Sequence, residues 1–458
     1  MNRLFTIALF LILHSSLFIL RSAAQTDCKL THKVAKKETV YGISRLYGIT
    51  QEELLAANPQ VGEKGLKKGT LLCIPYSNAE RDSLNRVAAE QAEAERRAQM
   101  HLPSTIKLAV ILPFALNAPA QTDEAQKMID FYKGVLLVVD SLKRVGLNLD
   151  VLVLDEGTAE ASNIQTALVH SALPDVDLII GPGRSANVNA VAAYAQQHQI
   201  PLVLPFANAD GIVGGRPYVF QCNAPKSNHY QKVVNRFVTR HRSDNIVFID
   251  REENTSGDGY VAELIQQLTG RGISFSRVHI SDMDEQLVPL LKSSMNNVLV
   301  PTSASASSFD MVCQNLNDLN VAAAYNVQLI GSPEWQTLTG KSQKNMYKYN
   351  ATYFATFYTN SLSTRTQQFC QLFYQNFGHQ QFVSYPRYGE MGHDIAAFFL
   401  TALQRYGNQF FASIQRHDFN SLQLPLHFTR KDAQSGYVNT ATYIIYYKAD
   451  GDVFLNTF

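Results

Sequence analysis

The residues that commonly carry catalysis do not occur here in catalytic spacing. The sequence contains no His-Glu-x-x-His, no Gly-x-Ser-x-Gly and no Walker phosphate loop, which mark zinc proteases, serine hydrolases and nucleoside triphosphatases. Gly181-Pro182-Gly183 lacks the third glycine of a dinucleotide-binding turn. None of the cysteine spacings matches a zinc site. We therefore expect a protein that is not an enzyme and that holds no metal ion and no cofactor.

Two strings deserve a separate test, because they match part of the signature of the penicillin-recognising enzymes. Ser104-Thr105-Ile106-Lys107 has the Ser-x-x-Lys spacing, and Ser243-Asp244-Asn245 is the Ser-Asp-Asn string. The third string, Lys-Thr-Gly, is missing. Ser104 also enters an apolar run typical of a strand, whereas the mechanism needs the serine and lysine one helical turn apart. We expect both matches to be accidental.

The composition indicates a folded protein with no nucleic-acid partner. Hydrophobic residues make up 46% of the chain and charged residues 17%, unlike the charge-rich composition of disordered chains. Lysine and arginine number 40 against 39 aspartates and glutamates, whereas nucleic-acid-binding domains usually carry a basic excess. A length of 458 residues predicts two or three domains.

The N-terminus resembles a secretory signal. Arg3 precedes a mostly apolar stretch from Leu4 to Leu20, and Ser22-Ala23-Ala24 follows as a small-x-small cleavage pattern. We expect residues 1–24 to be a signal peptide cut after Ala24, with the mature protein in the periplasm. An uncleaved anchor is the alternative, because the stretch just reaches the length of a membrane span.

Export places the five cysteines in an oxidising compartment. Cys28 and Cys73 bracket one short segment that cannot bury much apolar surface by itself. A disulfide between them is therefore expected. The odd number leaves at least one cysteine unpaired. Cys313 and Cys370 lie in apolar contexts, so we expect them to be small buried hydrophobic side chains.

Residues 28–76 have the pattern of a small βααβ module. Leu30 to Ala35 alternates like a strand, and a helical run follows Thr39. Thr50 with Glu53 forms a capping-box pattern before a second helix. Thr70 to Ile74 then reads as a strand that Pro75 stops.

The segment resembles a LysM domain over its whole length, in residue types and in spacing. The matching strings are His32-Lys33-Val34, Glu38-Thr39-Val40, Ile43, Leu46 to Thr50, Leu54, Asn58-Pro59, Leu66 to Gly69 and Leu71 to Pro75. The resemblance implies binding to the N-acetylglucosamine-containing glycan of peptidoglycan, in a groove between the first and second loops. The groove residues carried over by position are Glu38, Thr39, Val40, Asn58, Pro59, Gln60 and Leu66.

Two observations qualify this expectation. Lys37-Glu38 stands where the family usually has Gly-Asp, so the first loop departs from the family pattern. The alternative interpretation is that Val40 and Leu66 only pack the small core and that the module is a spacer.

The charge of the module supports wall binding. Residues 25–76 carry eight lysines and arginines against five acidic residues, a bias that favours an anionic wall polymer.

Residues 77–103 change in composition and predict a helical linker. The stretch from Glu80 to Met100 is rich in alanine, glutamate, glutamine and arginine, and Pro103 ends it.

From Ile106 onward, apolar runs typical of buried strands alternate with helical patterns. The alternation restarts near Ile246. Together these patterns predict two α/β lobes with parallel sheets.

The order of several strings resembles the type I periplasmic binding fold, in particular the branched-chain amino acid receptor group. They are Leu178 to Pro182 with Ser185, Ile200 to Ala207, Tyr218 to Phe220, Asp258 to Tyr260 and Gly392 to Ala396. The resemblance covers residues 104–458 and implies three chain crossings between the lobes. We expect lobe one at about 104–225 and 360–412, and lobe two at about 226–359 and 413–458.

In such folds a ligand lies at the carboxyl ends of the parallel strands. The candidate contacts there are Ser185, Ala207, Asn208, Asp250 and Thr302. Ser185 begins a helix whose amides suit a carboxylate. An amino-acid ligand also needs an acidic partner for its ammonium group, and Pro301 to Ala304 supplies none, so Asp250 or Glu252 would have to substitute. Ordinary cap and turn roles are the alternative for these residues.

The expected function is that of an exported binding protein, anchored to peptidoglycan through the LysM domain. Its bilobed domain would bind a small polar ligand such as an amino acid. The alternative is a peptidoglycan-associated scaffold or regulator, whose bilobed domain docks an envelope or wall-synthesis protein.

Overall fold

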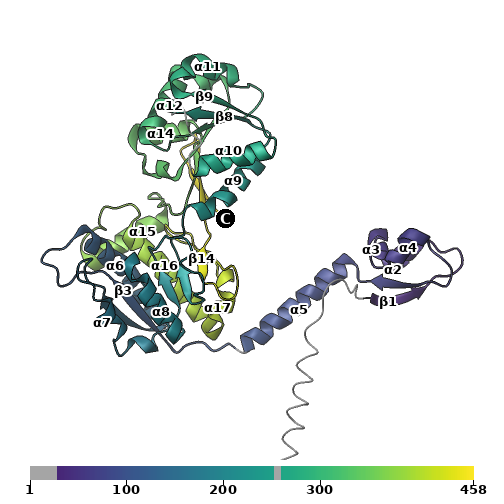
Figure 1. Ribbon diagram of the computed structural model, residues 1–458, viewed down its shortest axis with the longest axis horizontal. Helices are drawn as coiled ribbons and strands as arrows, with labels where there is room; N and C mark the ends of the chain where they lie inside the picture. The colour runs from purple at the N-terminus through teal and green to yellow at the C-terminus, as the bar shows by residue number, and fades with distance from the viewer. Residues whose placement is uncertain (1–27, 99, 252–258) are drawn as a thin grey trace, which may run out of the picture. The chain divides into compact units, whose positions relative to one another are not determined.

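The computed structural model describes residues 28–98, 100–251 and 259–458. The expected signal peptide at residues 1–24 lies outside these ranges, as do Glu252 and Asp258. The described residues form two compact units that divide after residue 100 (Figure 1). No helix within the described ranges is both long enough and apolar enough to span a bilayer.

The first unit is a two-stranded antiparallel sheet with three short helices, followed by one long helix. Its apolar core is formed mainly by Val34, Ile43, Leu54, Leu72 and Ile74. The short helix from Pro59 to Lys64 was not expected, although proline at the first helical position favours a helix start. The elements are β1 (Cys28–Lys33), α2 (Val40–Tyr47), α3 (Gln51–Ala56), α4 (Pro59–Lys64), β2 (Leu71–Pro75) and α5 (Asn78–Ala98).

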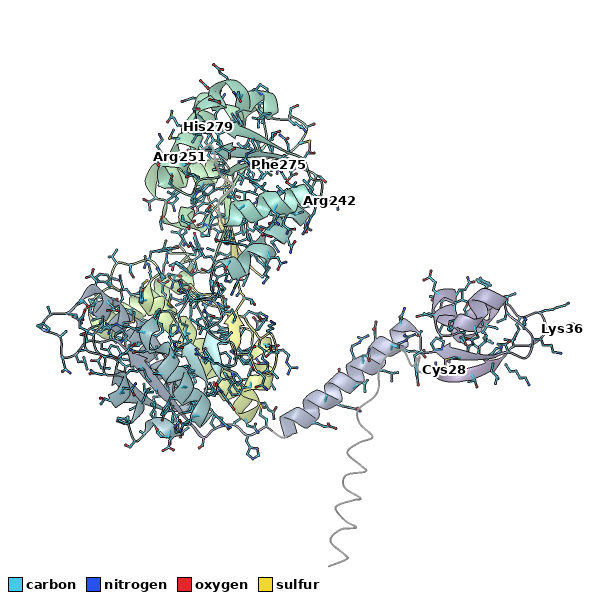
Figure 2. The ribbon with its side chains drawn as sticks, in the orientation of Figure 1. Cys28, Lys36, Arg242, Arg251, Phe275 and His279 are labelled. Carbon is cyan, nitrogen blue, oxygen red and sulfur yellow. A yellow bond between two sulfur atoms is a disulfide. The ribbon has the colours of Figure 1, made fainter. Side chains whose placement is uncertain are left out.

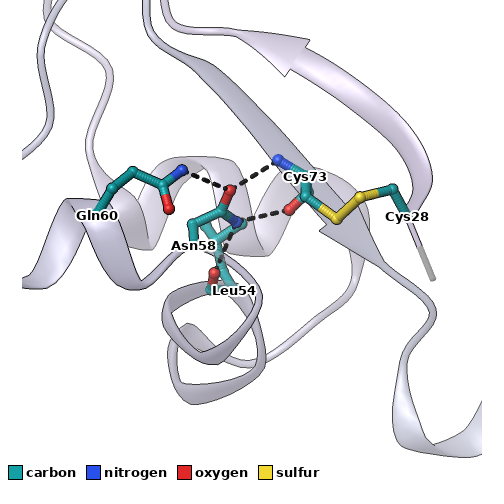
Figure 3. The surroundings of a disulfide bond; sticks show 5 residues. All are labelled: Cys28, Leu54, Asn58, Gln60 and Cys73. Carbon is teal, nitrogen blue, oxygen red and sulfur yellow. Dashed lines mark hydrogen bonds between the residues drawn. A yellow bond between two sulfur atoms is a disulfide. The ribbon is translucent and has the colours of Figure 1, made fainter. Parts of the chain in front are cut away.

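A disulfide joins Cys28 at the start of β1 to Cys73 in β2, so it closes the sheet at one end (Figure 3). The start of α5 is tied to the same module. The amide of Asn78 donates to the Glu53 carboxylate at 2.8 Å, and Lys29 pairs with Glu80. Farther along α5, Leu84 and Val87 are about half exposed. The helix therefore has a fixed beginning and a solvated middle.

The second unit contains two seven-stranded, mostly parallel sheets, which confirms the expected mixed α/β architecture with two lobes. The first sheet has the order β13-β14-β7-β6-β5-β3-β4. Its strands are β3 (Thr105–Leu112), β4 (Asn148–Asp155), β5 (Leu178–Ile180), β6 (Leu202–Leu204), β7 (Val219–Gln221), β13 (Phe428–Thr429) and β14 (Tyr437–Asn439). Its helices include α6 (Asp123–Arg144), α7 (Ile164–Leu168), α8 (Val188–His198), α15 (Thr364–Phe377), α16 (Tyr388–Tyr406) and α17 (Phe410–Ser413).

The second sheet has the order β16-β15-β12-β11-β10-β8-β9. Its strands are β8 (Asn245–Asp250), β9 (Phe275–His279), β10 (Asn297–Pro301), β11 (Val327–Gly331), β12 (Thr352–Ala355), β15 (Tyr443–Tyr447) and β16 (Val453–Thr457). The helices of this lobe are α9 (Ser227–His241), α10 (Tyr260–Gly270), α11 (Met283–Leu290), α12 (Ala306–Asp318), α13 (Val321–Ala324) and α14 (Gly340–Lys348). Each sheet has an apolar cluster on each face, as expected of sheets covered by helices on both sides.

The expected lobe boundary at residue 412 is wrong. β14 pairs in parallel with β7, and β13 pairs with β14, so the chain between residues 413 and 439 still belongs to the first sheet. The third crossing follows β14 and leads directly into β15. β13 and β14 span only two and three residues, which is too short for a periodic pattern in the sequence.

The string Gly392-His393-Asp394 holds lobe one together. A Cβ atom on Gly392 would lie 2.0 Å from the carbonyl oxygen of Phe131, so only glycine allows α16 to pack this closely on α6. The buried Asp394 carboxylate accepts hydrogen bonds from the amides of Leu422, Gln423 and Leu424 at 2.7–2.9 Å. This string therefore has a structural role that explains why it stands out in the sequence.

Candidate functional site

The first expected glycan-binding loop is held by its own side chains. Glu38 accepts from the amide of Ala35 at 2.6 Å and lies 2.9 Å from Nε2 of His32, whose Nδ1 lies 2.9 Å from the Tyr47 hydroxyl. The Ala35 amide, and after it His32, lowers the pKa of Glu38. Thr39 caps α2 by accepting from the Gly42 amide at 3.0 Å. Both polar side chains therefore shape the loop.

Lys37 explains how the loop tolerates its departure from the family pattern. Its φ angle is 73°, in the left-handed region that glycine adopts without strain. The backbone thus keeps the shape that the usual glycine would give it, although a lysine occupies the position. The conformation carries a steric cost of about 1–2 kcal/mol for a residue with a Cβ atom.

The second expected loop contains one residue that is not available to a ligand. Asn58 is buried, and its Nδ2 donates to the carbonyl oxygens of Leu54 and Cys73 at 2.8 and 2.6 Å. Its Oδ1 accepts from the Cys73 amide at 2.7 Å and from the Gln60 side chain at 3.3 Å (Figure 3). Asn58 therefore connects α3 to β2 next to the disulfide, and its role is to position the loop.

The remaining predicted residues divide into exposed and packed ones. Pro59, Gln60 and Thr39 are exposed, whereas Val40 and Leu66 are half-buried against the module core. The first loop lies against the chain before β2, because Val34 donates to the Thr70 carbonyl oxygen at 2.9 Å and Gly69 donates back at 2.8 Å. The chain after β1 therefore lies beside the chain before β2, and Val40 and Leu66 pack against the same small core.

Exposed lysines surround these loops. Lys36, Lys37, Lys67 and Lys68 are all exposed, and Figure 2 shows Lys36 projecting from the module. Within the described part of the chain, no carboxylate forms an ion pair with any of the four. Tyr41 and Leu71 are also more than half exposed. Sequence reasoning did not single out these two apolar side chains, because both fit the helix and strand patterns.

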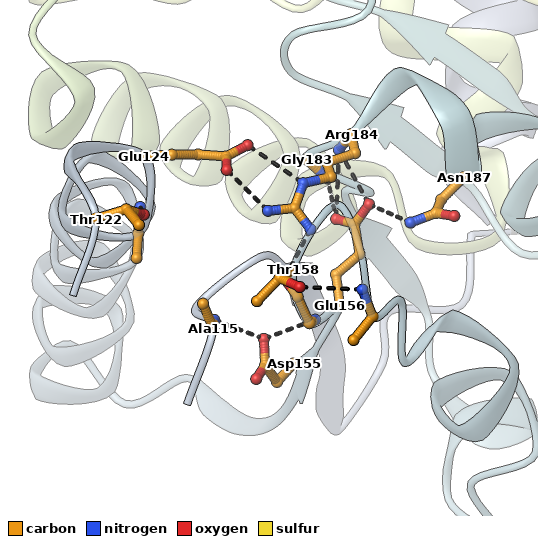
Figure 4. Close-up of polar contacts among 12 residues, drawn as sticks. Ala115, Thr122, Glu124, Asp155, Glu156, Thr158, Gly183, Arg184 and Asn187 are labelled. Atoms are coloured by element: carbon orange, nitrogen blue, oxygen red, sulfur yellow. Dashed lines mark hydrogen bonds and ion pairs between the residues drawn. The ribbon is translucent and has the colours of Figure 1, made fainter. Parts of the chain in front are cut away.

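In lobe one, the amides near Ser185 already bind a carboxylate of the protein itself. Glu156 follows β4, is fully buried, and accepts from the amides of Gly183 and Arg184 at 2.7 and 3.1 Å (Figure 4). It also accepts from Nδ2 of Asn187 at 2.6 Å. Burial raises the pKa of Glu156, while the three donors act in the opposite direction. The Glu156 carboxylate therefore already occupies the backbone amides at the start of the helix after β5.

Arg184 and Asp155 make further polar contacts around Glu156. The Arg184 guanidinium donates to the Glu124 carboxylate at 2.8 Å and to the Gly157 carbonyl oxygen at 2.7 Å. Asp155 accepts from the amides of Ala115 and Gly157, each at 3.0 Å (Figure 4). Glu156 is not among the residues expected from the sequence to form the site. Its position directly after an apolar strand, and hence at the carboxyl edge of the sheet, is the signal that could have identified it.

The other lobe-one candidates lie on the loop after β6. Ala207 is buried and its carbonyl oxygen accepts from the Gln221 side chain at 3.1 Å, whereas Asn208 is exposed. Next to them Phe206 is half-buried, with ring centroids 5.2 Å from Phe131 and 5.7 Å from Tyr388. Sequence reasoning did not predict this aromatic group, since Tyr388 lies far from Phe206 in the chain.

In lobe two, the acidic candidate is already paired. Both oxygens of Asp250 accept from the Arg277 guanidinium at 2.7 Å, and this contact raises the pKa of Arg277. Thr302 donates its hydroxyl to the Ile249 carbonyl oxygen at 3.3 Å. Asp250 therefore does not offer an unpaired carboxylate to the ammonium group of an amino acid.

The neighbouring strand ends of lobe two present a cation. Arg251 donates to the hydroxyls of Ser305 and Ser307 at 2.8 and 2.9 Å, and its carbonyl oxygen lies 2.9 Å from Nε2 of His279. Figure 2 shows Arg251 and His279 in the same region of this lobe. The strand ends of the two lobes thus hold the carboxylates of Glu156 and Asp250, and the guanidinium groups of Arg184, Arg251 and Arg277, all bound within the protein.

A hollow of about 920 Å³ lies elsewhere, beside the chain crossings. Its lining includes Lys232, Arg365, His427, Tyr443 and Leu455, and none of the predicted ligand contacts. Among the residues that the structure describes, no group of three or more histidine, cysteine or acidic side chains is placed to hold a metal ion.

Comparison with known proteins identifies the family. A model described as periplasmic binding protein matches residues 115–452, and a LysM domain model matches residues 32–75. No curated protein was found to match the chain. These matches confirm both resemblances that the sequence indicated.

One solved structure with a TM-score above 0.5 supports the fold, and two others are similar at lower scores. A protein of Rhodospirillum rubrum described as a branched-chain amino acid ABC transporter superposes with a TM-score of 0.53 at 13% identity, over 77% of this chain and 100% of that chain. A branched-chain amino acid ligand-binding protein from Burkholderia xenovorans gives 0.46 at 16% identity, over 77% and 95%. A substrate-binding protein from Desulfitobacterium hafniense in complex with Leu gives 0.42 at 15%, over 77% and 100%. With a family model matching most of its length, the chain belongs to the periplasmic binding protein family and carries an N-terminal LysM domain.

Proposed function

We propose that the protein is an exported, non-catalytic binding protein of the periplasm that is anchored to peptidoglycan through its LysM domain. The observation that carries this proposal is the exposure of Thr39, Pro59 and Gln60 in the two predicted loops, beside lysines with which no carboxylate pairs in the described part of the chain. Exposed backbone groups with a few apolar contacts suit a neutral acetamido sugar. The lysines suit the carboxylates of the wall polymer.

The anchoring proposal is tested by sedimentation. The chain from residue 25 onward is mixed with purified peptidoglycan sacculi at physiological salt and centrifuged. We expect it to sediment, with Gln60→Ala weakening the binding severalfold. Gln51→Ala is the matched control, because Gln51 is an exposed glutamine on α3 outside the two loops. If the unmodified chain stays in the supernatant, the anchoring proposal is wrong.

The two-lobed domain is proposed to bind a small polar ligand between its lobes, as members of its family do. The exposed Ser185 and Asn208, the hydroxyl of Thr302 and the aromatic group around Phe206 are the proposed contacts. An amino acid remains within this class. However, it cannot rely on an unpaired Asp250 or on the amides of Gly183 and Arg184, because Arg277 and Glu156 bind these groups.

Ligand binding is tested by native mass spectrometry of the purified protein, followed by thermal denaturation with a panel of amino acids, short peptides and sugars. A ligand at one hundred times its Kd stabilises the folded state by about 2.7 kcal/mol, which gives a clear rise in Tm. A flat response across the panel, together with the absence of a co-purified molecule, would contradict the proposal.

The second candidate is a wall-associated scaffold whose bilobed domain docks an envelope or wall-synthesis protein. A specific observation favours it: the two carboxylates at the predicted ligand site, Glu156 and Asp250, are both bound by groups of the protein itself. Cross-linking in cells tests this candidate. Recovery of one defined envelope protein, together with a flat response to small molecules, is the outcome expected for a scaffold.

A further inference from the structure

The sheet of the second lobe has an edge strand, β16. Among the described residues β16 pairs only with β15, and the antiparallel register joins Tyr443 to Thr457 and Tyr447 to Val453. Residues 442 and 458 exchange both backbone hydrogen bonds at 3.2 Å. Hydrogen-bonded and non-bonded pairs alternate in such a ladder. Val453, Leu455 and Thr457 therefore direct their N–H and C=O groups away from β15.

This edge lacks the features that usually protect an edge strand. Natural edges are blunted by charged side chains, proline or very short strands. β16 has the five-residue sequence Val-Phe-Leu-Asn-Thr, with no charge and no proline. Phe454 is 52% exposed and Leu455 is 39% exposed. An apolar, unblocked edge is a template on which another extended chain can pair.

A row of cations on α9 runs beside the same two strands. Lys232, Arg236 and Arg240 are spaced four residues apart, so they share one face of the helix. Lys232 and Arg236 lie over the ring of Phe458 at 4.7 and 4.9 Å, and Arg240 lies over Tyr446 in β15 at 5.6 Å. Within the described ranges, no carboxylate pairs with these three side chains.

There is also room along this flank. The hollow of about 920 Å³ is lined by Leu455 and Thr457 of the edge, by Phe458 and by Lys232 of the cation row. Figure 1 shows the yellow C-terminal strands of this lobe next to α9. Open backbone groups, exposed apolar side chains and unneutralised cations thus occur together on one surface.

We propose that β16 and the cation row of α9 form a docking surface for an extended, acidic segment of a partner protein, which adds to the sheet as an eighth strand. The backbone of the segment would pair with Val453, Leu455 and Thr457, and its carboxylates would meet Lys232, Arg236 and Arg240. Main-chain pairing supplies affinity in this mode, and the side chains supply selection. The positive charges of Lys232, Arg236 and Arg240 favour a partner segment that is acidic.

A second copy of this chain is a poorer occupant. Pairing β16 with its own copy across a two-fold axis would bring two rows of three cations toward each other. Like charges placed together across an interface are unfavourable. The inference gives the scaffold candidate a surface and a partner chemistry. Its failure would leave both wall anchoring and ligand binding untouched, because neither uses this surface.

The test uses fluorescein-labelled eight-residue peptides and the chain from residue 25 onward, with fluorescence anisotropy at 50 mM salt. A Glu-Val repeat is the probe. A Lys-Val repeat controls for charge, and a Glu-Pro repeat controls for backbone pairing, since proline lacks the N–H donor. We expect the Glu-Val repeat to bind at least about tenfold more tightly than either control, and its binding to weaken as salt is raised.

Two variants locate the site. Leu455→Pro removes an outward donor without touching the ladder to β15 and should abolish peptide binding, whereas Leu455→Ala should retain it. Arg236→Glu combined with Arg240→Glu should weaken binding at least about tenfold. If Leu455→Pro does not fold, a Glu-Val peptide methylated on alternate backbone nitrogens makes the same test on the unmodified protein.

Three results would overturn the proposal. Equal binding of the Glu-Val and Glu-Pro repeats would mean that charge alone attracts the peptide. Unchanged affinity in Leu455→Pro would place the peptide elsewhere on the protein. A concentration-dependent dimer in sedimentation that Leu455→Pro abolishes would assign the edge to a second copy.

Discussion

Replacing Glu156 tests whether the start of the helix after β5 is closed by the protein itself. The carboxylate accepts two backbone amides and one side-chain amide, at 2.6–3.1 Å, in a fully buried position. In Glu156→Ala these three donors lose their acceptor. Because an unsatisfied buried donor costs about 1–3 kcal/mol, and relaxation recovers part of that, we expect a loss of roughly 3–5 kcal/mol in unfolding free energy. Glu156→Gln keeps one acceptor oxygen and should lose about half as much.

The assay is urea denaturation of the full chain, with and without formate or acetate. If the vacated donors form an anion site, a small carboxylate at about ten times its Kd restores about 1.4 kcal/mol to Glu156→Ala. The unmodified protein should show no such gain. Chloride at the same ionic strength is the control for nonspecific salt effects. A loss below about 1 kcal/mol, or equal gains in both proteins, would refute the reasoning.

The contribution of Glu156 to the free energy of unfolding should depend on pH. Burial raises the pKa of Glu156, so the folded protein binds that proton more tightly than the unfolded chain does. The contribution of Glu156 to stability is therefore fully present below the ordinary glutamate pKa and declines as pH rises through the raised value. The stability difference between the protein and Glu156→Gln should accordingly be larger at pH 4 than at pH 7.

Three further predictions concern other parts of the chain. Burial lowers the pKa of His229 to about 4. Acidification from pH 7 to pH 5 should therefore lower the free energy of unfolding by about 2 kcal/mol in the unmodified protein but not in His229→Gln, as measured by denaturation at each pH. Equal losses in the two proteins would contradict this prediction. Lys37→Gly should raise the stability of the first unit by about 0.5–1 kcal/mol by calorimetry, and Lys36→Gly should not, because only Lys37 has a positive φ. Gly392→Ala should destabilise lobe one by about 3 kcal/mol or more, whereas Gly270→Ala, with open space around its Cβ position, should be neutral or stabilising in the same melting experiment.

Much of the architecture follows from local patterns. The capping box at Thr50 and Glu53 is present as expected, with both of its hydrogen bonds. The apolar runs at residues 108–112 and 246–249 are buried strands that pair with a neighbour on each side. Such runs identify strands covered on both faces because every residue in them must avoid water. The boundary near residue 412 failed because β14 acquires its strand character only by pairing with β7, and β13 only by pairing with β14.

The candidate site could be predicted from the sequence to a smaller extent than the fold. The sequence identifies the strand ends at Ser185, Asn208, Asp250 and Thr302, since each follows an apolar run. It cannot show that Glu156 binds the amides next to Ser185, or that Arg277 binds Asp250, because both contacts join residues 27 or more positions apart. Asn58 likewise has the residue type of a ligand contact, and only its burial between α3 and β2 assigns it to the scaffold.

Taken by itself, the sequence determined the two families, the order of the longer elements and the residues at the strand ends, because these depend on spacing and on short-range preferences. The tertiary structure decided which polar groups are available to a ligand. That availability depends on which distant side chain is close enough to satisfy each buried donor or charge, and the energetic penalty for leaving one unsatisfied ensures that a partner is found. The open edge of β16 beside α9 was likewise decided by the tertiary structure, because the sequence of β16 has none of the charges or prolines that usually mark an edge strand.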